Sequence, residues 1–580
     1  MSDAAPLIQA AINSAPSNTV VVIPQGRWRI DSRISISQNK DFVTLRGSGA
    51  GTVLDCRTST CVYVGSGSDY GWAWPTSGNL VTAYAPDNLT GGTKLTIANT
   101  SAFSVNQLVN HRVANDTSLP VLSVAGFNNL RRQMTRVVAK TATSLTVFPP
   151  IYGHERFVKL GATVNVAQMQ TDFAGIEDLV LDGTNGKVSY AVWFEQTYAS
   201  WIKNVTVTRA SNYSVFVMSS LNCELRHSRL DELNHSGPNG AGLLMNTVSG
   251  CLIEDNIILE SFPNIEINNG SSGNVVAYNF INNKSGLIGI DTNHGPHNSF
   301  NLYEGNVSHN LMSDGYYGSN SDDTVYRNLL HGNGIAASGT PTYCLSLKRF
   351  ARNFSLVGNI FGSARHAARC DGYGLPNIGN GNWTGTAQPT AGDYWNDWRP
   401  DIGTMIRGTL IGRTDDFHGT VRLSSGTMFR GQSPALWPVT GPTMFSWVTV
   451  VSVTGNVVAV DSSPWQVKLP PLNTLLRIEP GSGGFQELDL DVEATTLKKA
   501  NNFIPTGIPP GESLVGTILP PSLYLAAKPV WFGQLAWPPF NPYVPNLSYE
   551  AIPAGYRYTY GVAPPGASTP QTPSGLRVVR

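Results

Sequence analysis

The sequence has few charged residues and no excess of either sign. Only 13% of the 580 residues are charged, and 39 Lys and Arg balance 39 Asp and Glu, which gives a formal net charge of zero. Proteins that bind nucleic acid or an anionic membrane surface usually present an excess of positive charge. We therefore expect neither nucleic acid nor a membrane among the partners of this chain.

Long apolar runs are also missing. No stretch approaches the roughly 20 apolar residues that a membrane-spanning helix requires. The N-terminal MSDAAPLIQAAINSAP has neither the basic nor the apolar region of a secretory signal. We expect a secreted, extracellular bacterial protein whose signal peptide has been removed.

Helical patterns are scarce, whereas residues typical of turns are abundant. The chain contains 58 Gly and 37 Pro and has an Asn-rich middle, a composition that favours many short strands and turns. Similar segments recur through this middle, each with an apolar strand, a polar corner and a second apolar strand. They are WIKNVTV, ELRHSRL, LIEDNII, VVAYNFI, LYEGNVS, TVYRNLL and SLVGNIF.

The polar corners recur at intervals of 22 to 31 residues. The spacing, together with β-branched strands and no helical pattern between corners, predicts the coils of a β-solenoid. Stacking would place equivalent side chains about 4.8 Å apart, a distance at which Asn amides bond one another. The predicted corner residues are Asn204, Ser228, Asn256, Asn279, Asn306, Asn328 and Asn359, with Asp178 before them and Thr409 after them.

An asparagine ladder at a two-residue bend resembles the right-handed parallel β-helix of the pectate lyase superfamily, which includes pectate lyases, polygalacturonases and phage tailspikes. The segment APLIQAAINSAPSNTVVVIPQGRWRI is similar to the capping helix and first strand of that family. The resemblance implies an all-β fold, a right-handed parallel β-helix (solenoid) with an N-terminal capping helix. Two segments with period-two alternation are expected to form small inserted β domains.

Changes in pattern divide the chain into five expected parts. These are the N-terminal cap and first coils (1–79), a small inserted β domain (80–152), the parallel β-helix with its groove (153–425), a β-rich insertion and last coils (426–514), and a Pro-rich wrapping tail and linker (515–580). A long Trp-rich loop, 372–400, interrupts the coils. The linker suggests a further module beyond it.

The six cysteines permit oxidation without requiring it. Cys56 and Cys61 can close a small loop. Cys223 and Cys251 fall at the same position of successive repeats, and side-by-side parallel strands are a poor geometry for a disulfide. We expect these two to be reduced or simply stacked.

One strand of each coil has inward apolar residues at alternate positions, so the residues between them point outward. These strands are AVWFEQ, SVFVMS, GLLMNT, NIEINN, LIGIDT, GYYGSN and CLSLKR. The outward positions are apolar in the first coils and become polar further on, at Glu266, Asn268, Asp291, Tyr317 and Lys348. The resemblance implies that this face forms the substrate groove.

Outward carboxylates favour glycoside hydrolysis, which requires two carboxyl groups beside the scissile bond. The alignment places Glu266 and Asp291 one coil and two residues apart, about 8 Å between Cα atoms from strand spacings. That distance lies in the rough range of ~6.5–9.5 Å that leaves room for an attacking water. Asp314, in SDGYYGS, is a third candidate acid. This chemistry requires no cofactor.

Two histidines follow Asp291 in GIDTNHGPHN. His294 is a candidate catalytic residue and His297 a candidate substrate ligand, because both fall in the loop beside the groove. A transition-metal site is disfavoured, since no cysteine or third histidine lies nearby in the sequence.

A polysaccharide lyase acting on a uronate-containing polymer is the close alternative. Hard oxygen ligands on Glu266, Asn268 and Asp291 suit Ca²⁺, and Lys348, His294 or Arg349 would be the base. The strand CLSLKRF is similar to the Arg-Ile-Lys strand of polygalacturonases. The paired-aspartate strand and the Gly-His-Gly strand of that family have no counterpart here.

Aromatic residues favour a polysaccharide or oligosaccharide as the partner. The candidate stacking residues are Trp383, Trp395 and Trp398 of the Trp-rich loop, and further candidate substrate ligands are Arg349 and His366. We expect a carbohydrate-active enzyme that cleaves glycosidic bonds, with glycoside hydrolase favoured narrowly over lyase. A non-catalytic glycan-binding β-helix, an adhesin or spike, is the second alternative.

Overall fold

The structure is a computed structural model of the whole chain. It describes all residues except 1, 38, 66–80, 87–91, 114–118, 120, 123–130, 154–162, 167–169, 232–239, 284–287, 315–317, 334–342, 348–350, 366–369, 373–405, 426–434, 439–442, 445, 480–489, 515–517 and 569–580.

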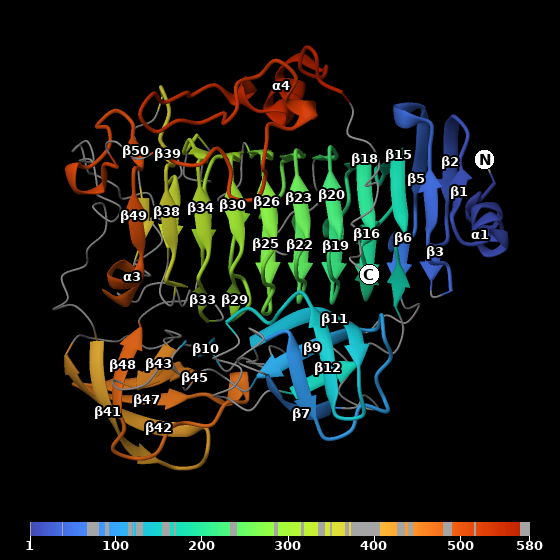
Figure 1. Cartoon of the computed structure of the whole chain (residues 1–580). Coiled ribbons are helices and arrows are strands. Elements are labelled where there is room, and N and C mark those ends of the chain that lie inside the picture. Colours follow the sequence, from blue (N-terminus) through green and yellow to red (C-terminus); the bar gives the residue numbers. More distant parts are fainter. Residues whose placement is uncertain are drawn as a thin grey trace.

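Parallel strands stack into a right-handed β-helix of about nine turns among the described residues (Figure 1), which confirms the predicted fold class. One of its faces, here called the front sheet, has each strand hydrogen-bonded to the next coil. In stacking order its strands are β3 (Ile34–Ser37), β6 (Thr60–Gly65), β16 (Tyr190–Glu195), β19 (Tyr213–Met218), β22 (Ala241–Asn246), β25 (Ile265–Asn268), β28 (Ile290–Asp291), β32 (Leu311–Ser313), β36 (Leu345–Leu347) and β40 (Cys370–Gly372).

The rest of each coil forms a second set of parallel strands, here called the ladder sheet. Most coils contribute two short strands separated by a bend. They are β1 (Thr19–Val22), β2 (Gly26–Ile30), β4 (Val43–Arg46), β5 (Thr52–Cys56), β15 (Gly175–Asp182), β18 (Trp201–Thr208), β20 (Glu224–Arg226), β21 (Arg229–Asp231), β23 (Leu252–Glu254), β24 (Ile257–Leu259), β26 (Val275–Ala277), β27 (Phe280–Asn282), β30 (Leu302–Glu304), β31 (Val307–Ser308), β34 (Thr324–Tyr326), β35 (Leu329–Leu330), β38 (Ser355–Val357), β39 (Ile360–Phe361), β49 (Leu497–Lys499) and β50 (Asn502–Phe503).

Buried asparagines stack along the bend of the ladder sheet. Each Nδ2 donates to the Oδ1 of the next coil at 2.9–3.0 Å. The same Oδ1 accepts a backbone N–H of the preceding coil, so one side chain satisfies several groups at the bend. The members of this ladder are Asn256, Asn279, Asn306, Asn328, Asn359 and Asn501.

Three predicted members of the ladder are wrong. Val205, not Asn204, occupies the ladder position, because its N–H donates to Ser228 Oγ at 3.2 Å. Asn204 and Asp178 precede that position and have positive φ angles of 51° and 56°. Asn and Asp tolerate such angles better than most residues. An Asn at a bend in the sequence therefore fits both the ladder position and the positive-φ position just before it. Thr409 lies in an antiparallel strand outside the coils.

The interior of the coils is apolar from one end of the stack to the other. The N-terminal helix α1 (Ala5–Ser14) places Ile8 and Ile12 in this core, at the end that would otherwise expose it. Along the front sheet the inward residues of successive coils are Val192, Val215, Leu243, Ile265, Ile290, Leu311 and Leu345.

Two small β units lie on one side of the stack (Figure 1). The first is a closed barrel of β7 (Val81–Pro86), β8 (Lys94–Ile97), β9 (Leu108–Val113), β11 (Arg131–Lys140), β12 (Ser144–Phe148) and β13 (Thr163–Val166). Its strand β11 contacts the turns between the two sheets, where Met134 N donates to Ser249 Oγ at 3.0 Å.

The second unit is an antiparallel sheet of β41 (Ile406–Arg413), β42 (His418–Ser425), β43 (Ala435–Pro438), β45 (Ser446–Trp447), β46 (Thr449–Thr454), β47 (Val457–Asp461) and β48 (Leu475–Glu479). Residues 406–425 were expected in the coils, but they pair with this sheet instead. Alternation with period two is common to both kinds of strand, so the pattern does not distinguish them.

The C-terminal segment runs along the outside of the ladder sheet, as the red part of Figure 1 shows. Trp531, Phe532 and Phe540 pack there, together with Ile552 beside helix α4 (Pro553–Tyr560). They cover outward apolar residues of successive coils, among them Ile257, Phe280, Val307, Leu329 and Ile360.

Cys56 and Cys61 form a disulfide, as the sequence allowed. Cys223 and Cys251 are buried free thiols, in agreement with the prediction. In the part of the chain that the structure describes, no helix is long and apolar enough to cross a membrane.

Candidate active site

Glu266 and Asp291 occupy the same outward position on adjacent strands of the front sheet. Strand β25 pairs with β28 so that Glu266 lies opposite Asp291 and Ile265 lies opposite Ile290. The prediction of a two-residue offset was wrong. A shift by two residues preserves the inward–outward alternation, so the sequence pattern fits both registers.

The next coil also differs from the prediction. Its front-sheet strand is β32, in which Met312 follows Asp291 in the outward position, rather than a strand formed by GYYGSN. Asp314 lies just beyond the end of β32 and is only 2% exposed. The structure therefore gathers Glu266, Asp291 and Asp314 on three consecutive coils.

His294 connects the loop after β28 to the following coil. Its Nδ1 lies 2.5 Å from Asp314 Oδ2, in an ion pair. The imidazole is 38% exposed, whereas Asp314 beneath it is almost covered. Ligand atoms of Asp291, His294 and Asp314 all lie within 4.8 Å of one another.

Asn268 supports Glu266 from within the same strand. Its Nδ2 donates to Glu266 Oε1 at 2.7 Å. Its Oδ1 is buried without a hydrogen-bond partner. Asn268 thus fixes one carboxyl oxygen of Glu266 and presents an unused acceptor beside it.

Burial raises the pKa of Glu266, and the charge of Asp314 adds to this effect, while His294 and Asn268 act in the opposite direction. Burial also raises the pKa of Asp291 well above its usual range, again reinforced by Asp314 and opposed by His294. Burial would lower the pKa of His294, but Asp314 and the two other carboxyl groups outweigh it and raise the value to about 10. Both carboxyl groups therefore hold their protons more strongly than usual, and the imidazolium form of His294 is favoured.

The remaining predicted residues are not all in the cluster. His297 is completely buried in the turn that follows β28, with Nδ1 3.2 Å from Ser319 Oγ. Its role as a substrate ligand stays a prediction. The other predicted residues lie outside the described part of the chain: Tyr317, Lys348, Arg349, His366, Trp383, Trp395 and Trp398.

Aromatic residues cover the outer face of the front sheet in the coils before the acids. Tyr213 stacks on Tyr190 with ring centroids 5.6 Å apart, and Trp193 contacts Phe216 at 5.4 Å. Phe216, Leu244 and Glu266 are register partners on successive strands, so this patch adjoins the acids. The sequence analysis did not identify Tyr190 and Tyr213. Both are the first residues of front-sheet strands whose outward residues were predicted to be apolar.

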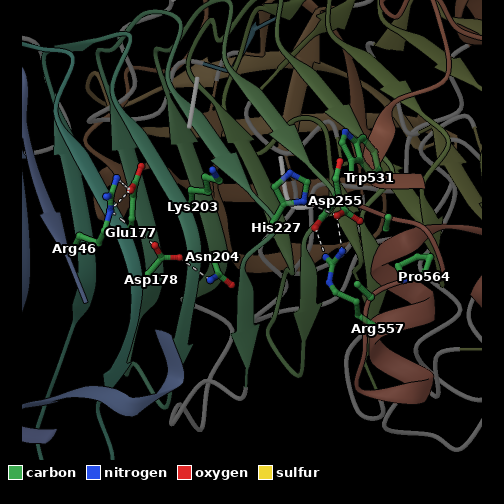
Figure 2. Close-up of a pocket in the computed structure, with 13 residues that line it drawn as sticks. Arg46, Glu177, Asp178, Lys203, Asn204, His227, Asp255, Trp531, Arg557 and Pro564 are labelled. Atoms are coloured by element: carbon green, nitrogen blue, oxygen red, sulfur yellow. Dashed lines mark hydrogen bonds and ion pairs between the residues drawn. The ribbon is translucent and has the colours of Figure 1, made fainter. Parts of the chain in front are cut away.

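A recess of about 700 Å³ lies between the ladder sheet and the C-terminal segment. Figure 2 shows its three acids already bonded: Glu177 to Arg46, Asp178 to Asn204, and Asp255 to both His227 and Arg557. Trp531 closes one side, with its ring 5.6 Å from that of His227. The contacts of Arg557 with Asp255 and of Trp531 with His227 hold the C-terminal segment against the coils, so the recess has a structural explanation.

The fold and this cluster define a parallel β-helix protein with a row of acidic side chains on one sheet face. No family model matches the chain, and no curated protein matches it. Two solved tailspike structures are each similar to 82% of this chain at 12% identity. The first, gp61 of Pseudomonas phage phi297, matches over 92% of its own length with a TM-score of 0.42. The second, gp49 of Pseudomonas phage LKA1, matches over 91% of its own length with a TM-score of 0.38.

An enzyme structure is also similar, DFA-IIIase from Arthrobacter chlorophenolicus A6 without its lid. It matches 62% of this chain and 85% of its own at 9% identity, with a TM-score of 0.32. All three TM-scores are below 0.5, so these likenesses carry no argument about the function of this chain.

Proposed function

We propose that this protein cleaves glycosidic bonds in a polysaccharide that lies across the front sheet. The observation that supports this most is the clustering of Glu266, Asp291 and Asp314 on three consecutive coils. Glycoside hydrolysis needs one protonated and one ionised carboxyl group beside the scissile bond. The cluster can supply both, because its members differ in environment.

Asp291 is the proposed proton donor. It is 1% exposed, and burial together with the charge of Asp314 raises its pKa well above the usual range. A carboxyl group that stays protonated near neutral pH can protonate the leaving oxygen. Glu266, also raised in pKa and held by Asn268, is proposed to bind a sugar hydroxyl beside it.

Asp314 is the proposed carboxylate partner of Asp291. It forms the ion pair with His294 at 2.5 Å, and one of its oxygens lies within 4.8 Å of Asp291. Carboxyl groups about 5–5.5 Å apart are typical of glycosidases that retain the anomeric configuration, in which the second carboxylate attacks the sugar. The expected mechanism is therefore double displacement, with Asp314 as the nucleophile.

A lyase that uses Ca²⁺ remains the alternative. Carboxylate oxygens of Asp291 and Asp314 lie close together, and Asn268 Oδ1 is an unused acceptor. His294 argues against this ion, because its Nδ1 lies 2.5 Å from Asp314 Oδ2 and Ca²⁺ prefers oxygen ligands. The described residues thus fit proton transfer better than calcium binding.

Digestion of a polysaccharide panel tests the proposal. The panel contains acidic and neutral polymers, each incubated with and without EDTA. New reducing ends that form equally in EDTA are expected. Cleavage that EDTA abolishes, with absorbance from an unsaturated product near ~235 nm, would establish the lyase. Tight binding of a polymer without any cleavage would establish a glycan-binding β-helix.

We also propose that the protein acts outside the cell. The Cys56–Cys61 disulfide is suited to the oxidising extracellular compartment.

A further inference from the structure

Two arginines lie side by side where the inserted barrel meets the β-helix. Arg112 on β9 and Arg132 on β11 are direct partners in an antiparallel pair. Residues opposite each other in such a pair project to the same side, with Cβ atoms about 5 Å apart. Arg132 Nη1 donates to Thr247 Oγ1 at 3.3 Å, so this side faces the coils. Like charges at this spacing repel one another.

Both guanidinium groups are buried, and both have donors without partners. Arg112 is 6% exposed and Arg132 is 5% exposed. Arg112 Nε and Nη2 and Arg132 Nε are buried with no hydrogen-bond acceptor. Asn110, one alternate position along the same face of β9, has both side-chain polar atoms in the same condition. Within the described residues, neither arginine has a carboxylate at ion-pair distance.

A third arginine on the same strand shows how the interface provides a counter-charge elsewhere. Arg136 also lies on this face of β11, and its Nη2 is 2.8 Å from Asp172 Oδ2. The same guanidinium lies over the ring of Tyr198, 4.0 Å from its centroid. The β-helix therefore provides Arg136 with a carboxylate and an aromatic ring. Among the described residues it provides no carboxylate to Arg112 or Arg132.

The two unmatched arginines remain charged near neutral pH. Burial lowers the pKa of Arg132 to about 9, and the charge of Arg112 contributes to this shift. Burial also lowers the pKa of Arg112. Two buried positive charges on directly opposite residues are unfavourable unless an anion accompanies them. The N–H donors without acceptors are also the groups that bind an anion.

We propose that Arg112, Arg132 and Asn110 form a binding site for an oxyanion. Guanidinium groups present paired N–H donors that match a carboxylate, sulfate or phosphate, and the amide of Asn110 adds a further donor. The same chemistry is met in a free inorganic anion and in the acidic group of a sugar. The site goes beyond glycan cleavage and does not depend on it.

The site lies at the end of β22, the strand that pairs with the Glu266 strand β25. Thr247, which binds Arg132, directly follows Asn246, and Asn246 is the register partner of Asn268. Asn268 in turn bonds Glu266. An anion held by Arg112 and Arg132 therefore borders the region that a polymer on the front sheet would cross.

Titration calorimetry on the full chain tests the site. Sodium sulfate and sodium glucuronate are titrated separately into protein in a zwitterionic buffer of low salt, with sodium chloride at matched ionic strength as the reference. Saturable binding of sulfate, glucuronate or both is expected. Arg112→Gln and Arg132→Gln should each weaken that binding by about tenfold or more, because each removes charge-assisted hydrogen bonds. Arg136→Gln, the matched control, should bind as the wild type does.

The outcomes distinguish the sources of the anion. Sulfate binding without glucuronate binding identifies a site for a small inorganic anion, and glucuronate binding identifies a site for an acidic sugar. The proposal is overturned if the wild type binds neither anion. It is also overturned if Arg112→Gln and Arg132→Gln both keep wild-type affinity. None of these results bears on whether a polysaccharide is cleaved, so the two proposals fail separately.

Discussion

Glu266 and Asp291 are register partners on adjacent coils, and both carboxyl groups face the same side of the front sheet. Adjacent parallel strands are about 4.8 Å apart, so the two acids are nearer than an offset of two residues would allow. Gathering acids in this way is unfavourable when all are ionised. The raised pKa values of Glu266 and Asp291 and the positive charge of His294 both reduce this repulsion.

Asp291→Asn should abolish most of the glycan cleavage without unfolding the protein. Loss of a proton donor typically lowers the rate by about 10²–10⁴-fold. The neutral amide has the shape of a carboxyl group whose pKa is raised well above its usual range in the fold. Glu266→Gln should lower the rate less, about tenfold, if it only binds a sugar hydroxyl. Rates of reducing-end release and thermal unfolding midpoints check both.

Met312→Leu is the matched control for these variants. Met312 is the outward partner of Asp291 on the next strand, and a Met-to-Leu exchange conserves volume. It should leave the rate unchanged. Equal rates for the wild type and Asp291→Asn would exclude Asp291 as the proton donor.

His294 should make stability fall as the pH rises. Its pKa is raised from 6.5 to about 10 in the folded state, so folding favours the protonated form. Its stabilising contribution is complete below pH 6.5 and is lost as the pH rises through about 10. His294→Gln should therefore unfold at a lower temperature than the wild type near pH 6, and this difference should shrink towards pH 10. A difference that is constant with pH would refute the ion pair with Asp314.

The asparagine ladder should contribute strongly to stability at Asn306. Its Nδ2 donates to Val276 O and Asn328 Oδ1, and its Oδ1 accepts two hydrogen bonds from Asn279. Asn306→Ala leaves buried polar groups unsatisfied, at about 1–3 kcal/mol for each. The expected result is a clear fall in the unfolding midpoint.

Asn204→Gly is the control for Asn306→Ala. Asn204 is exposed, has a φ of 51°, and its Nδ2 donates to Asp178 Oδ1 at 2.7 Å. Glycine adopts that backbone conformation readily, so the unfolding midpoint should change little. Similar falls in the unfolding midpoint of both variants would mean that the ladder position contributes no more to stability than the exposed position of Asn204.

The sequence predicted the fold well because stacking repeats one pattern in every coil. Asn256, Asn279 and Asn306 mark the bend, and the alternation around them defines the inward face. Register was harder to predict. The coil that contains Asp291 differs in length from its neighbours, and a two-residue shift leaves the alternation intact. The sequence therefore identified Glu266 and Asp291 as outward acids but not as direct partners.

Other parts of the site could not be inferred because they depend on contacts between distant segments. Asp314 was found as an acid, but its ion pair with His294 requires the loop after β28 to reach the next coil. The pair Arg112 and Arg132 depends on the register of β9 and β11 and on how the barrel packs. No local pattern in the sequence specifies either arrangement.

The most direct test of the proposed function is cleavage of a susceptible polysaccharide in oxygen-18-labelled water, with mass analysis of the products. Hydrolysis adds one water to each broken bond, so every new reducing end should contain one labelled oxygen. The reducing ends that the wild type forms should carry this label. Asp291→Asn should form few such ends, because it cleaves slowly. Products that carry no label and are unsaturated would contradict the account and establish elimination instead.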